Sequence, residues 1–489
     1  MRKHLLFPGL LMLAFFTLHG IHSQSNIQYD IVLKGGRVID PETNLDAVRN
    51  VGIVNDRIAE ISENDLNGKE IIDVSGMVVS PGFIDLHVHG VTNVEQEYQA
   101  HDGVTTALEL EGGISMLESW YKSRAGDAII NYGASVAWGF ARFMAMEKYR
   151  NLTENLEEFD SIVGRAANQS VREPLPSDEH PEMLKHIASE LQAGVVGIGL
   201  PIGYFPKATP EEDFRLYHFA GEKQVPIFTH VRGGGMIAIQ QALANAMTTG
   251  APLHIVHINS MALGDISLAI EMVNRAQGQG YQISTEMYPY TAASTSLESA
   301  MFDEGWQEEL GITYSDLQWV ATGERLTEET FGKYREDGGT VIIHMMKPEW
   351  INAGLATEGT VIGSDGMPYA KLAHPRTAGT FSRVLGKYVR EEKVLDLNDA
   401  IAKMTLLPAR ILEGFVPSMK NKGRIQVGAD ADLTIFDPDS IADKATFENG
   451  LAFSEGIGYV MVNGVFVIRD GKTVNNVHPG RPVYGKFKR

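Results

Sequence analysis

Apolar and polar residues alternate with a period of two near both ends of the chain. Near the N-terminus the alternation covers residues 29–40 and 50–62, around a Gly-Gly and an Asn-Asp turn, and near the C-terminus it covers 430–438 and 458–471. This period is typical of strands with one buried face, and Asn463-Gly464 predicts a two-residue hairpin turn. Both ends therefore predict one small all-β module, which we expect to be a β-sandwich.

The middle of the chain has a different pattern, in which short apolar runs alternate with longer segments that are compatible with helices. Strands of a parallel sheet are buried on both faces and give such runs. Eight runs with helical intervals predict an α/β fold, a (β/α)8 TIM-like barrel, whose reactive residues come from the carboxyl ends of its strands. The predicted strands are 78–85, 103–111, 194–200, 225–231, 252–258, 282–290, 341–346 and 360–365.

These patterns divide the chain into a barrel at residues 80–419 and a β-sandwich that combines residues 24–79 with residues 420–489. Residues 300–338 are rich in Glu, Gly and Thr and carry few strand signals. They form either an inserted lid over the barrel mouth or a plain surface excursion, and both interpretations stay open here.

Residues 1–23 have the arrangement of a secretory signal peptide. Arg2 and Lys3 precede an apolar run from Leu5 to Leu18, which small and polar residues follow. The run is shorter than the roughly 20 apolar residues of a membrane-spanning helix. We expect cleavage near Ser23 and an exported protein, periplasmic or extracellular, without a stable membrane span; an uncleaved anchor helix is the alternative.

Composition limits the chemistry that a site in this chain can use. The 489 residues include no cysteine, which excludes disulfides, thiolate metal sites and a cysteine nucleophile, so a metal ion would need histidine and carboxylate ligands. The chain has 42 Lys and Arg against 62 Asp and Glu, a formal charge of −20, which argues against a nucleic acid partner.

Five residues of metal-binding types stand at the ends of predicted barrel strands. His87 and His89 form an HxH pair after the first strand, and residues two apart on a strand point to the same side. The other three are His230 after FT, His257 after HIV and Asp365 after GS. One such histidine is commonly a core residue, but this set in this order predicts a metal site at the barrel mouth.

Longer strings make the chain resemble the amidohydrolase superfamily and, within it, the N-acyl-D-amino-acid deacylase (D-aminoacylase) family. The resemblance covers nearly the whole chain after the N-terminal run. The most specific strings are STEMYPYTAAST at 284–295 and HPRTAGTFSRVLG at 374–386, beside PGFIDLHVHG at 81–90 and GSDGMP at 363–368. The resemblance implies a metal-dependent barrel with a β-sandwich from both termini, in agreement with the pattern.

The resemblance also implies roles for the five residues. His87 and His89 would hold one metal ion, His230 and His257 the other, and Asp365 would bind metal and serve as general base. Such chemistry suits amide hydrolysis, because a divalent ion lowers the pKa of bound water to around 7 and a nearby carboxylate can move the proton. We expect one or two divalent ions, zinc first, with manganese or iron as alternatives.

The sequence departs from the family at the bridging ligand, where the family carries a cysteine and other amidohydrolases a carboxylated lysine. Here the strand reads ALELEGG. We assign the bridge to Glu111 at the strand end, with Glu109 on the same face as the alternative. Two buried carboxylates require a cation nearby, because an unpaired buried charge is costly.

The substrate-binding residues that the resemblance implies are Arg376 of the HPR string, Tyr204 and Tyr290, which would hold a substrate carboxylate. The family has a lysine two residues after the second metal histidine, whereas this chain has Asn259. With one positive charge fewer, a larger or neutral acyl-amino substrate enters consideration.

These observations predict a metal-dependent hydrolase that deacylates N-acyl-D-amino acids or related D-residue amides. A dipeptidase or cyclic-amide hydrolase on the same barrel is the nearest alternative, and a non-catalytic binding protein is a more distant one. The expected partner is a small N-acyl amino acid or similar amide, and a homo-oligomer is compatible with the sequence. The strings GxSxG, HExxH and GxxxxGK[ST] are absent, which disfavours serine hydrolases, zincins and P-loop proteins.

Overall fold

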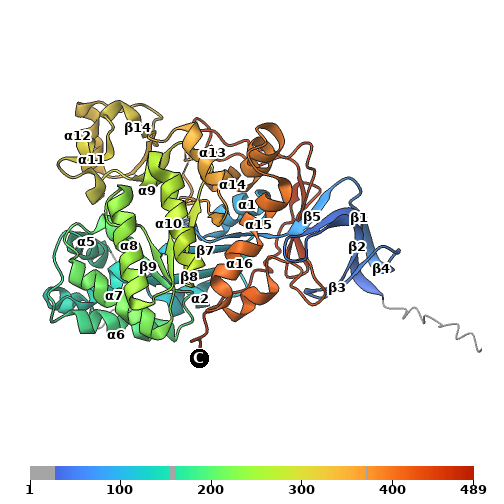
Figure 1. The fold of residues 1–489 in the computed structure, drawn as a ribbon, viewed down its shortest axis with the longest axis horizontal. Coiled ribbons are helices and arrows are strands. Elements are labelled where there is room, and N and C mark those ends of the chain that lie inside the picture. Colours follow the sequence, from blue (N-terminus) through green and yellow to red (C-terminus); the bar gives the residue numbers. More distant parts are fainter. Residues whose placement is uncertain (1–27, 154–160, 371–372) are drawn as a thin grey trace, which may run out of the picture.

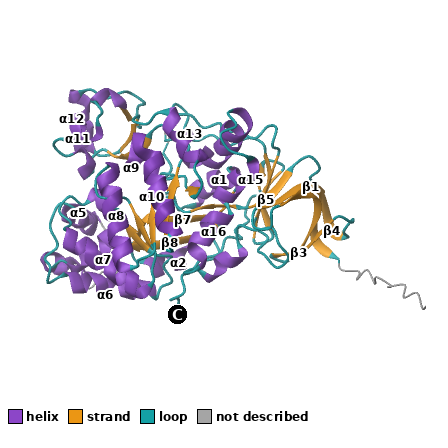
Figure 2. Cartoon of the chain, viewed as in Figure 1, coloured by secondary structure: helices purple, strands orange, loops and turns teal. Residues whose placement is uncertain are grey.

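A barrel of eight parallel strands forms the centre of the protein, in a computed structural model that describes residues 28–153, 161–370 and 373–489 (Figures 1 and 2). The predicted signal peptide at residues 1–23 lies outside the described residues. In spatial order the barrel strands are β6 (Phe83–Asp85), β7 (Val104–Ile114), β8 (Asn131–Ala137), β9 (Ile198–Leu200), β10 (Ile227–Thr229), β11 (Leu253–Ile255), β12 (Ile283–Met287) and β16 (Thr360–Ile362). The predicted TIM-like α/β barrel is confirmed.

Two of the strand predictions differ from the structure. The run at 341–346 is not a barrel strand, because β15 (Thr340–Ile343) pairs with two strands of a separate sheet. Its place in the barrel belongs to β8, which reads NYGASVA and carries too few β-branched residues to stand out as a strand. The predicted strand 78–85 is two strands, β5 (Val78–Pro81) in the terminal sheet and β6 in the barrel.

Gly82 makes the step from one sheet to the other. A Cβ at this position would lie 2.2 Å from the side chain of Thr105, so only glycine fits between the two strands. The apolar run therefore crosses a domain boundary that the pattern alone places inside a single strand.

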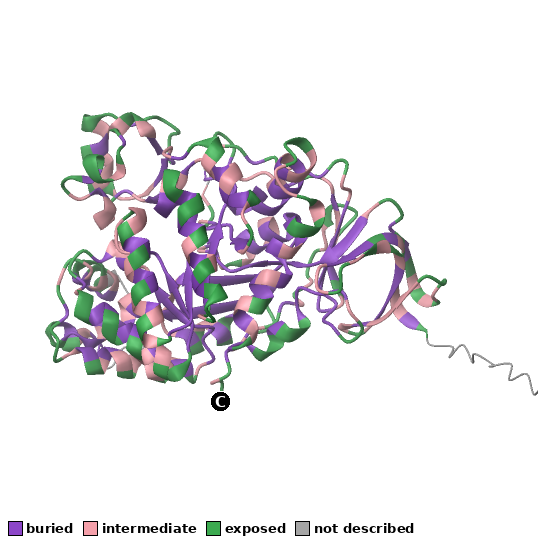
Figure 3. Ribbon diagram, in the orientation of Figure 1, coloured by how far each residue is buried: buried purple, intermediate pink, exposed green. Residues whose placement is uncertain are grey.

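Helices surround the barrel and turn their buried faces toward the strands, which are buried along their length (Figure 3). The α-helices of the barrel are α1 (Asn93–His101), α2 (Leu117–Arg124), α3 (Trp138–Ala145), α4 (Arg150–Thr153), α5 (Ser161–Ser170), α6 (His180–Leu191), α7 (Pro210–Lys223), α8 (Gly235–Thr249), α9 (Ile258–Ala262), α10 (Ile266–Gly278), α13 (Pro348–Ala356), α14 (Arg376–Arg383), α15 (Leu397–Met404) and α16 (Leu406–Glu413). None of the helices in the described ranges combines the length and apolar character needed to cross a membrane.

The terminal module is one sheet of nine strands from both ends of the chain, at the right of Figure 1. Beside β5 it contains β1 (Tyr29–Asp40), β2 (Leu45–Val54), β3 (Arg57–Ser62), β4 (Gly68–Asp73), β17 (Leu433–Phe436), β18 (Ile457–Val462), β19 (Val465–Arg469) and β20 (Lys472–Thr473). The hairpin at Asn463-Gly464 is confirmed. The prediction of a turn at Gly35-Gly36 is wrong, because these two residues form a bulge within β1.

The last residues of the chain leave this sheet and return to the barrel. Tyr132 of β8 donates its N–H to the carbonyl of Arg481, and Val483 donates to the carbonyl of Tyr132. The predicted β-sandwich segment 420–489 therefore does not belong entirely to the terminal module, because its final residues form hydrogen bonds with the barrel strand β8.

Residues 293–346 form a small unit with its own sheet and core, at the upper left of Figure 1. The sheet contains β13 (Ala293–Ser296), β14 (Leu317–Trp319) and β15, and the unit includes α11 (Trp306–Leu310) and α12 (Glu328–Asp337). Phe302, Trp306 and Phe331 pack together in its core. The predicted insertion 300–338 lies within this unit.

Candidate metal centre

The six predicted metal-binding residues meet at the carboxyl ends of five barrel strands. His87 and His89 follow β6, Glu111 belongs to β7, and the other three follow the strands β10 (His230), β11 (His257) and β16 (Asp365). All six are buried except His89, which is partly exposed. His257 and Asp365 have φ angles of 32° and 53°, a conformation that non-glycine residues rarely adopt and that often marks functional sites.

One group of ligand atoms consists of His87, His89, Glu111 and Asp365. The Nε2 atoms of His87 and His89 each lie 3.1 Å from Glu111 Oε2. Asp365 Oδ1 lies 3.5 Å from the first of these nitrogens and 3.4 Å from the second.

The second group consists of Glu111, His230 and His257. Glu111 Oε1 lies 2.9 Å from His230 Nδ1 and 3.3 Å from His257 Nε2. The two oxygens of Glu111 therefore face different histidine pairs, which is the arrangement of a carboxylate that bridges two cations.

Glu109, the alternative bridge, lies behind the site. Its Oε2 accepts a hydrogen bond of 2.8 Å from His89 Nδ1, and its Oε1 accepts bonds from the N–H groups of Gly112 and Gly113. Glu109 thus orients a histidine and does not reach the centre.

Glu286 holds the other histidine of this pair and was not identified in the sequence. It accepts a hydrogen bond from His87 Nδ1, and its Oε2 lies 3.1 Å from His254 Nε2. The nearby Gly363 leaves room for it, since a Cβ there would lie 2.6 Å from Glu286 Oε2. The available signal was a glutamate inside the buried strand ISTEM, which is costly unless it is paired.

The carboxylates around the centre favour positive charge at the first histidine pair. Burial opposes the charged forms of His87 and His89, but the neighbouring carboxylates outweigh it and hold the pKa of both rings well above the usual value. Burial raises the pKa of Glu111, but hydrogen bonds with the four histidines outweigh this effect. The pKa of Glu111 therefore lies well below its usual value.

The donor set fits one or two divalent cations. Four histidines and two carboxylates converge without any sulfur ligand, and imidazole with carboxylate suits zinc, manganese or iron. The outer carboxylates Glu109 and Glu286 bind the Nδ1 atoms of two of these histidines, as acceptors behind metal ligands commonly do.

A small cavity adjoins the cluster and includes side chains from the 293–346 unit. Its lining residues are Tyr204, His230, His257, Ser260, Met261, Tyr288, Ala293, Ser294, Thr295, Met301, Ile343, Met345 and Asp365. Tyr204 OH lies 3.1 Å from Thr295 Oγ1, which connects the barrel loop to the inserted unit.

Of the four predicted substrate-binding residues, the structure brings only Tyr204 to the cavity wall. Tyr290 lies behind it, where its hydroxyl donates to the carbonyl of Pro375, and Tyr288 lines the cavity instead. Arg376 is buried behind the wall, with its Nη1 2.8 Å from Asp365 Oδ2. Asn259 is also buried and donates from Nδ2 to the carbonyl of Tyr288.

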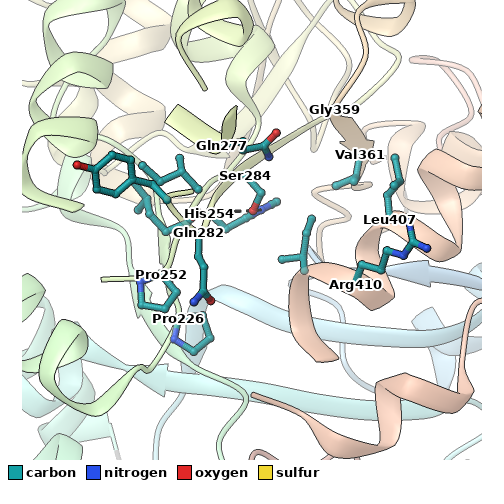
Figure 4. A pocket seen from close by; sticks show the side chains of 14 residues that line it. Pro226, Pro252, His254, Gln277, Gln282, Ser284, Gly359, Val361, Leu407 and Arg410 are labelled. Atoms are coloured by element: carbon teal, nitrogen blue, oxygen red, sulfur yellow. Dashed lines mark hydrogen bonds between the residues drawn. The ribbon is translucent and has the colours of Figure 1, made fainter. Parts of the chain in front are cut away.

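A second cavity, of about 330 Å³, lies at the opposite, amino ends of β11, β12 and β16 (Figure 4). His254 and Ser284 line it, and His254 Nδ1 lies 2.8 Å from Ser284 Oγ. None of the six converging residues reaches this cavity, but Glu286 connects it to His87 through His254.

Known proteins are similar to this chain both in sequence and in architecture. Residues 238–468 match the model of the Amidohydrolase family. An N-acyl-D-glutamate deacylase from Alcaligenes xylosoxydans xylosoxydans is 30% identical over 470 residues, which cover 90% of this chain and 93% of the relative.

Two solved structures resemble the fold along their whole length. An N-acyl-D-glutamate deacylase from Bordetella bronchiseptica, complexed with zinc and a phosphonate mimic of the tetrahedral intermediate, superposes with a TM-score of 0.79 at 25% identity and covers 94% of this chain and 100% of its own. A D-aminoacylase studied for its binuclear metal centre has a TM-score of 0.77 at 26% identity, with coverages of 93% and 100%.

These similarities extend over the barrel, the terminal module and the site, and they leave no support for a non-catalytic binding protein. The chain belongs to the amidohydrolase family, in the group of the N-acyl-D-amino-acid deacylases, and is a metal-dependent hydrolase of carbon–nitrogen bonds.

Proposed function

We propose that this protein removes the acyl group from N-acyl-D-amino acids or closely related D-residue amides. The observation that carries the proposal is the convergence of four histidines and Asp365 on the two oxygens of Glu111, in a chain of the deacylase group. The D preference comes from the relatives, among them the N-acyl-D-glutamate deacylase and the D-aminoacylase.

The residues that would hold the ions follow from the two groups of ligand atoms. His87, His89 and Asp365 would hold one ion, His230 and His257 the other, and Glu111 would bridge them. Zinc is the ion that we expect first, because four imidazoles and two carboxylates suit it and because a solved relative contains zinc.

A divalent ion held by these residues would polarise the scissile carbonyl and lower the pKa of a nearby water. Asp365 would accept the proton of the attacking water and pass it to the leaving amine. Burial raises the pKa of Asp365, but the charge of Arg376, whose Nη1 lies 2.8 Å from Oδ2, contributes to a pKa below the usual value. The carboxylate is therefore ionised, which is the form that a general base has before it takes up a proton.

The same proposal includes two features of the whole chain. Residues 1–23 would direct the protein out of the cytoplasm, with cleavage near Ser23. The insertion at 300–338 would serve as a lid, which the cavity supports because Met301 and other residues of the 293–346 unit line it beside Asp365.

The test is hydrolysis by the zinc-loaded protein of N-acetyl-D-methionine, its L enantiomer, a D-containing dipeptide and a cyclic amide, in one panel. We expect the D acyl amino acid to be hydrolysed fastest. Asp365→Asn should reduce this activity by about 100-fold or more, in the range of general acid–base catalysis, while the protein stays folded. Full activity of the Asp365→Asn protein with its metal retained, or preference for the cyclic amide, would contradict the proposal.

A further inference from the structure

The cavity beside the metal cluster contains an apolar wall without positive charge. Its lining includes Met261, Met301, Ile343 and Met345, and none of the described residues that line it is a lysine or an arginine. Met301, Ile343 and Met345 belong to the inserted unit. Met261 belongs to α9, which begins directly after His257.

Among the described residues, the guanidinium next to this cavity is that of Arg376, and its Nε has no hydrogen-bond partner there. Arg376 is buried, its Nη1 lies 2.8 Å from Asp365 Oδ2, and its Nη2 donates to the carbonyl of Ser294. Its Cζ stands 4.8 Å from the ring centroid of Tyr288. Arg376 can therefore contact a substrate group only at the Asp365 end of the cavity. It does not reach the side formed by Met261, Met301, Ile343 and Met345, here called the methionine wall.

Two other arginines near the barrel mouth do not line the cavity and have partners elsewhere. Arg383 pairs with Asp443 and stacks on Tyr290, and Arg232 donates to the carbonyl of Ala208. Asn259 carries no charge, and its amide donor is used by the carbonyl of Tyr288.

These contacts set a limit on the charge of a substrate. Arg376 can neutralise one carboxylate at the Asp365 end of the cavity, whereas a second carboxylate beside Met261, Met301, Ile343 and Met345 would have no cationic side chain of the lining to pair with. Burial of an unpaired carboxylate is costly, while flexible methionines adapt to apolar groups of different shape.

We propose that this cavity selects acyl amides whose substituents, beyond one carboxylate, are apolar and uncharged, on either side of the scissile bond. The proposal rests on the proposed deacylase function and narrows its substrate class. It separates this protein from an acidic-residue deacylase, although an N-acyl-D-glutamate deacylase is among its relatives.

The experiment compares four compounds on the zinc-loaded protein: N-acetyl-D-methionine, N-acetyl-D-glutamine, N-acetyl-D-glutamate and N-succinyl-D-methionine. Glutamine and glutamate have nearly the same size, so their ratio isolates the charge. We expect kcat/KM for each compound with two carboxylates to be at least about tenfold below that of its counterpart with one carboxylate, since an ion left unpaired on burial costs this much or more. Equal or faster hydrolysis of either would overturn the proposal.

A charge placed in the methionine wall should reverse the preference. Met345→Lys should raise kcat/KM for N-acetyl-D-glutamate relative to N-acetyl-D-glutamine by about tenfold, because a charge-assisted hydrogen bond becomes available. Met345→Leu is the matched control and should leave the ratio unchanged. Met301→Lys is the second variant if Met345→Lys does not fold, and an unchanged ratio in a folded lysine variant would count against the methionine wall.

Failure of the deacylase function is recognisable separately, as absence of hydrolysis of all four compounds. The dissociation constants of the same compounds, measured by calorimetry on the zinc-loaded protein, then decide. Tighter binding of the compounds with one carboxylate would support the charge limit, and equal or tighter binding of the compounds with two carboxylates would overturn it.

Discussion

The two histidine pairs around Glu111 differ in what stands behind them. In the first pair, His87 and His89 point Nε2 to the centre, and their Nδ1 atoms bind the buried carboxylates Glu286 and Glu109. In the second pair, His230 faces Glu111 with Nδ1, and His257 Nδ1 has no hydrogen-bond partner among the described residues.

The histidine pair with carboxylates behind it also belongs to the group with more ligand atoms. The first group offers four ligand atoms, including one from Asp365, and the second offers three. A carboxylate behind a histidine fixes the ring and raises its basicity as a ligand. Glu111 therefore faces two groups of ligand atoms that differ in number and in support, and we expect the group with His87 and His89 to bind a divalent ion more tightly.

Replacing the residue that both sites share should have the largest effect. Glu111→Ala removes a ligand from each group, so we expect loss of both ions and of hydrolysis, beyond the about 10–100-fold effect of losing an outer partner. Metal content by elemental analysis, together with the hydrolysis rate, checks this. Glu118→Ala, at an exposed position of α2, is the control, and unchanged metal content in Glu111→Ala would remove Glu111 from the ligands.

Replacing one histidine of each pair should separate the sites. His87→Asn should abolish the tighter of two zinc-binding steps, and His257→Asn the weaker, because the first group has more ligands and supported rings. Competition with a chelator of known zinc affinity measures both steps. If the tighter step disappears in His257→Asn and persists in His87→Asn, the expected order of the sites is wrong.

Glu286→Gln should weaken the first site without removing a ligand. We expect its zinc affinity to fall about 10–100-fold, the usual cost of losing a carboxylate behind a metal-binding histidine, with little change at the second site. Glu190→Gln, which changes a carboxylate that accepts from the N–H of Leu117, is the matched control. Equal weakening at both sites would show that Glu286 supports the barrel as a whole.

The smallest effect should come from Ser284, the last residue in the series of contacts His87–Glu286–His254–Ser284. Ser284→Ala removes the partner of His254 Nδ1. His254 in turn contacts Glu286, which accepts a hydrogen bond from His87. A neutral hydrogen bond contributes about 1 kcal/mol, so we expect less than about a tenfold loss of first-site zinc affinity. A loss as large as that of Glu286→Gln would mean that the amino-end cavity governs the site more strongly than its distance suggests.

The sequence was most informative where local pattern and chemistry coincide. His87, His89, His230, His257 and Asp365 each follow an apolar run, and parallel strands bring their carboxyl ends together, so their convergence could be predicted. Glu111 could be preferred to Glu109 from its position at the strand end, and the structure places it between the two pairs.

The residues that escaped prediction depend on contacts between distant segments. Glu286 gains its meaning only when β12 lies beside His87 and His254, which are far apart in the chain. Tyr288 and Tyr290 stand two residues apart, and the direction of the chain after β12 decides that Tyr288 lines the cavity. The small residues of β8 hid a barrel strand that is defined by its neighbours.

The sequence by itself determined the family, the barrel and the kind of ligands, because strand periodicity, strand-end residues and the absence of cysteine are properties of short segments. Only the tertiary structure decided which carboxylates stand behind the histidines and which side chains form the cavity wall. Those outcomes depend on distances between side chains from different strands and from the inserted unit, and no local pattern encodes such distances.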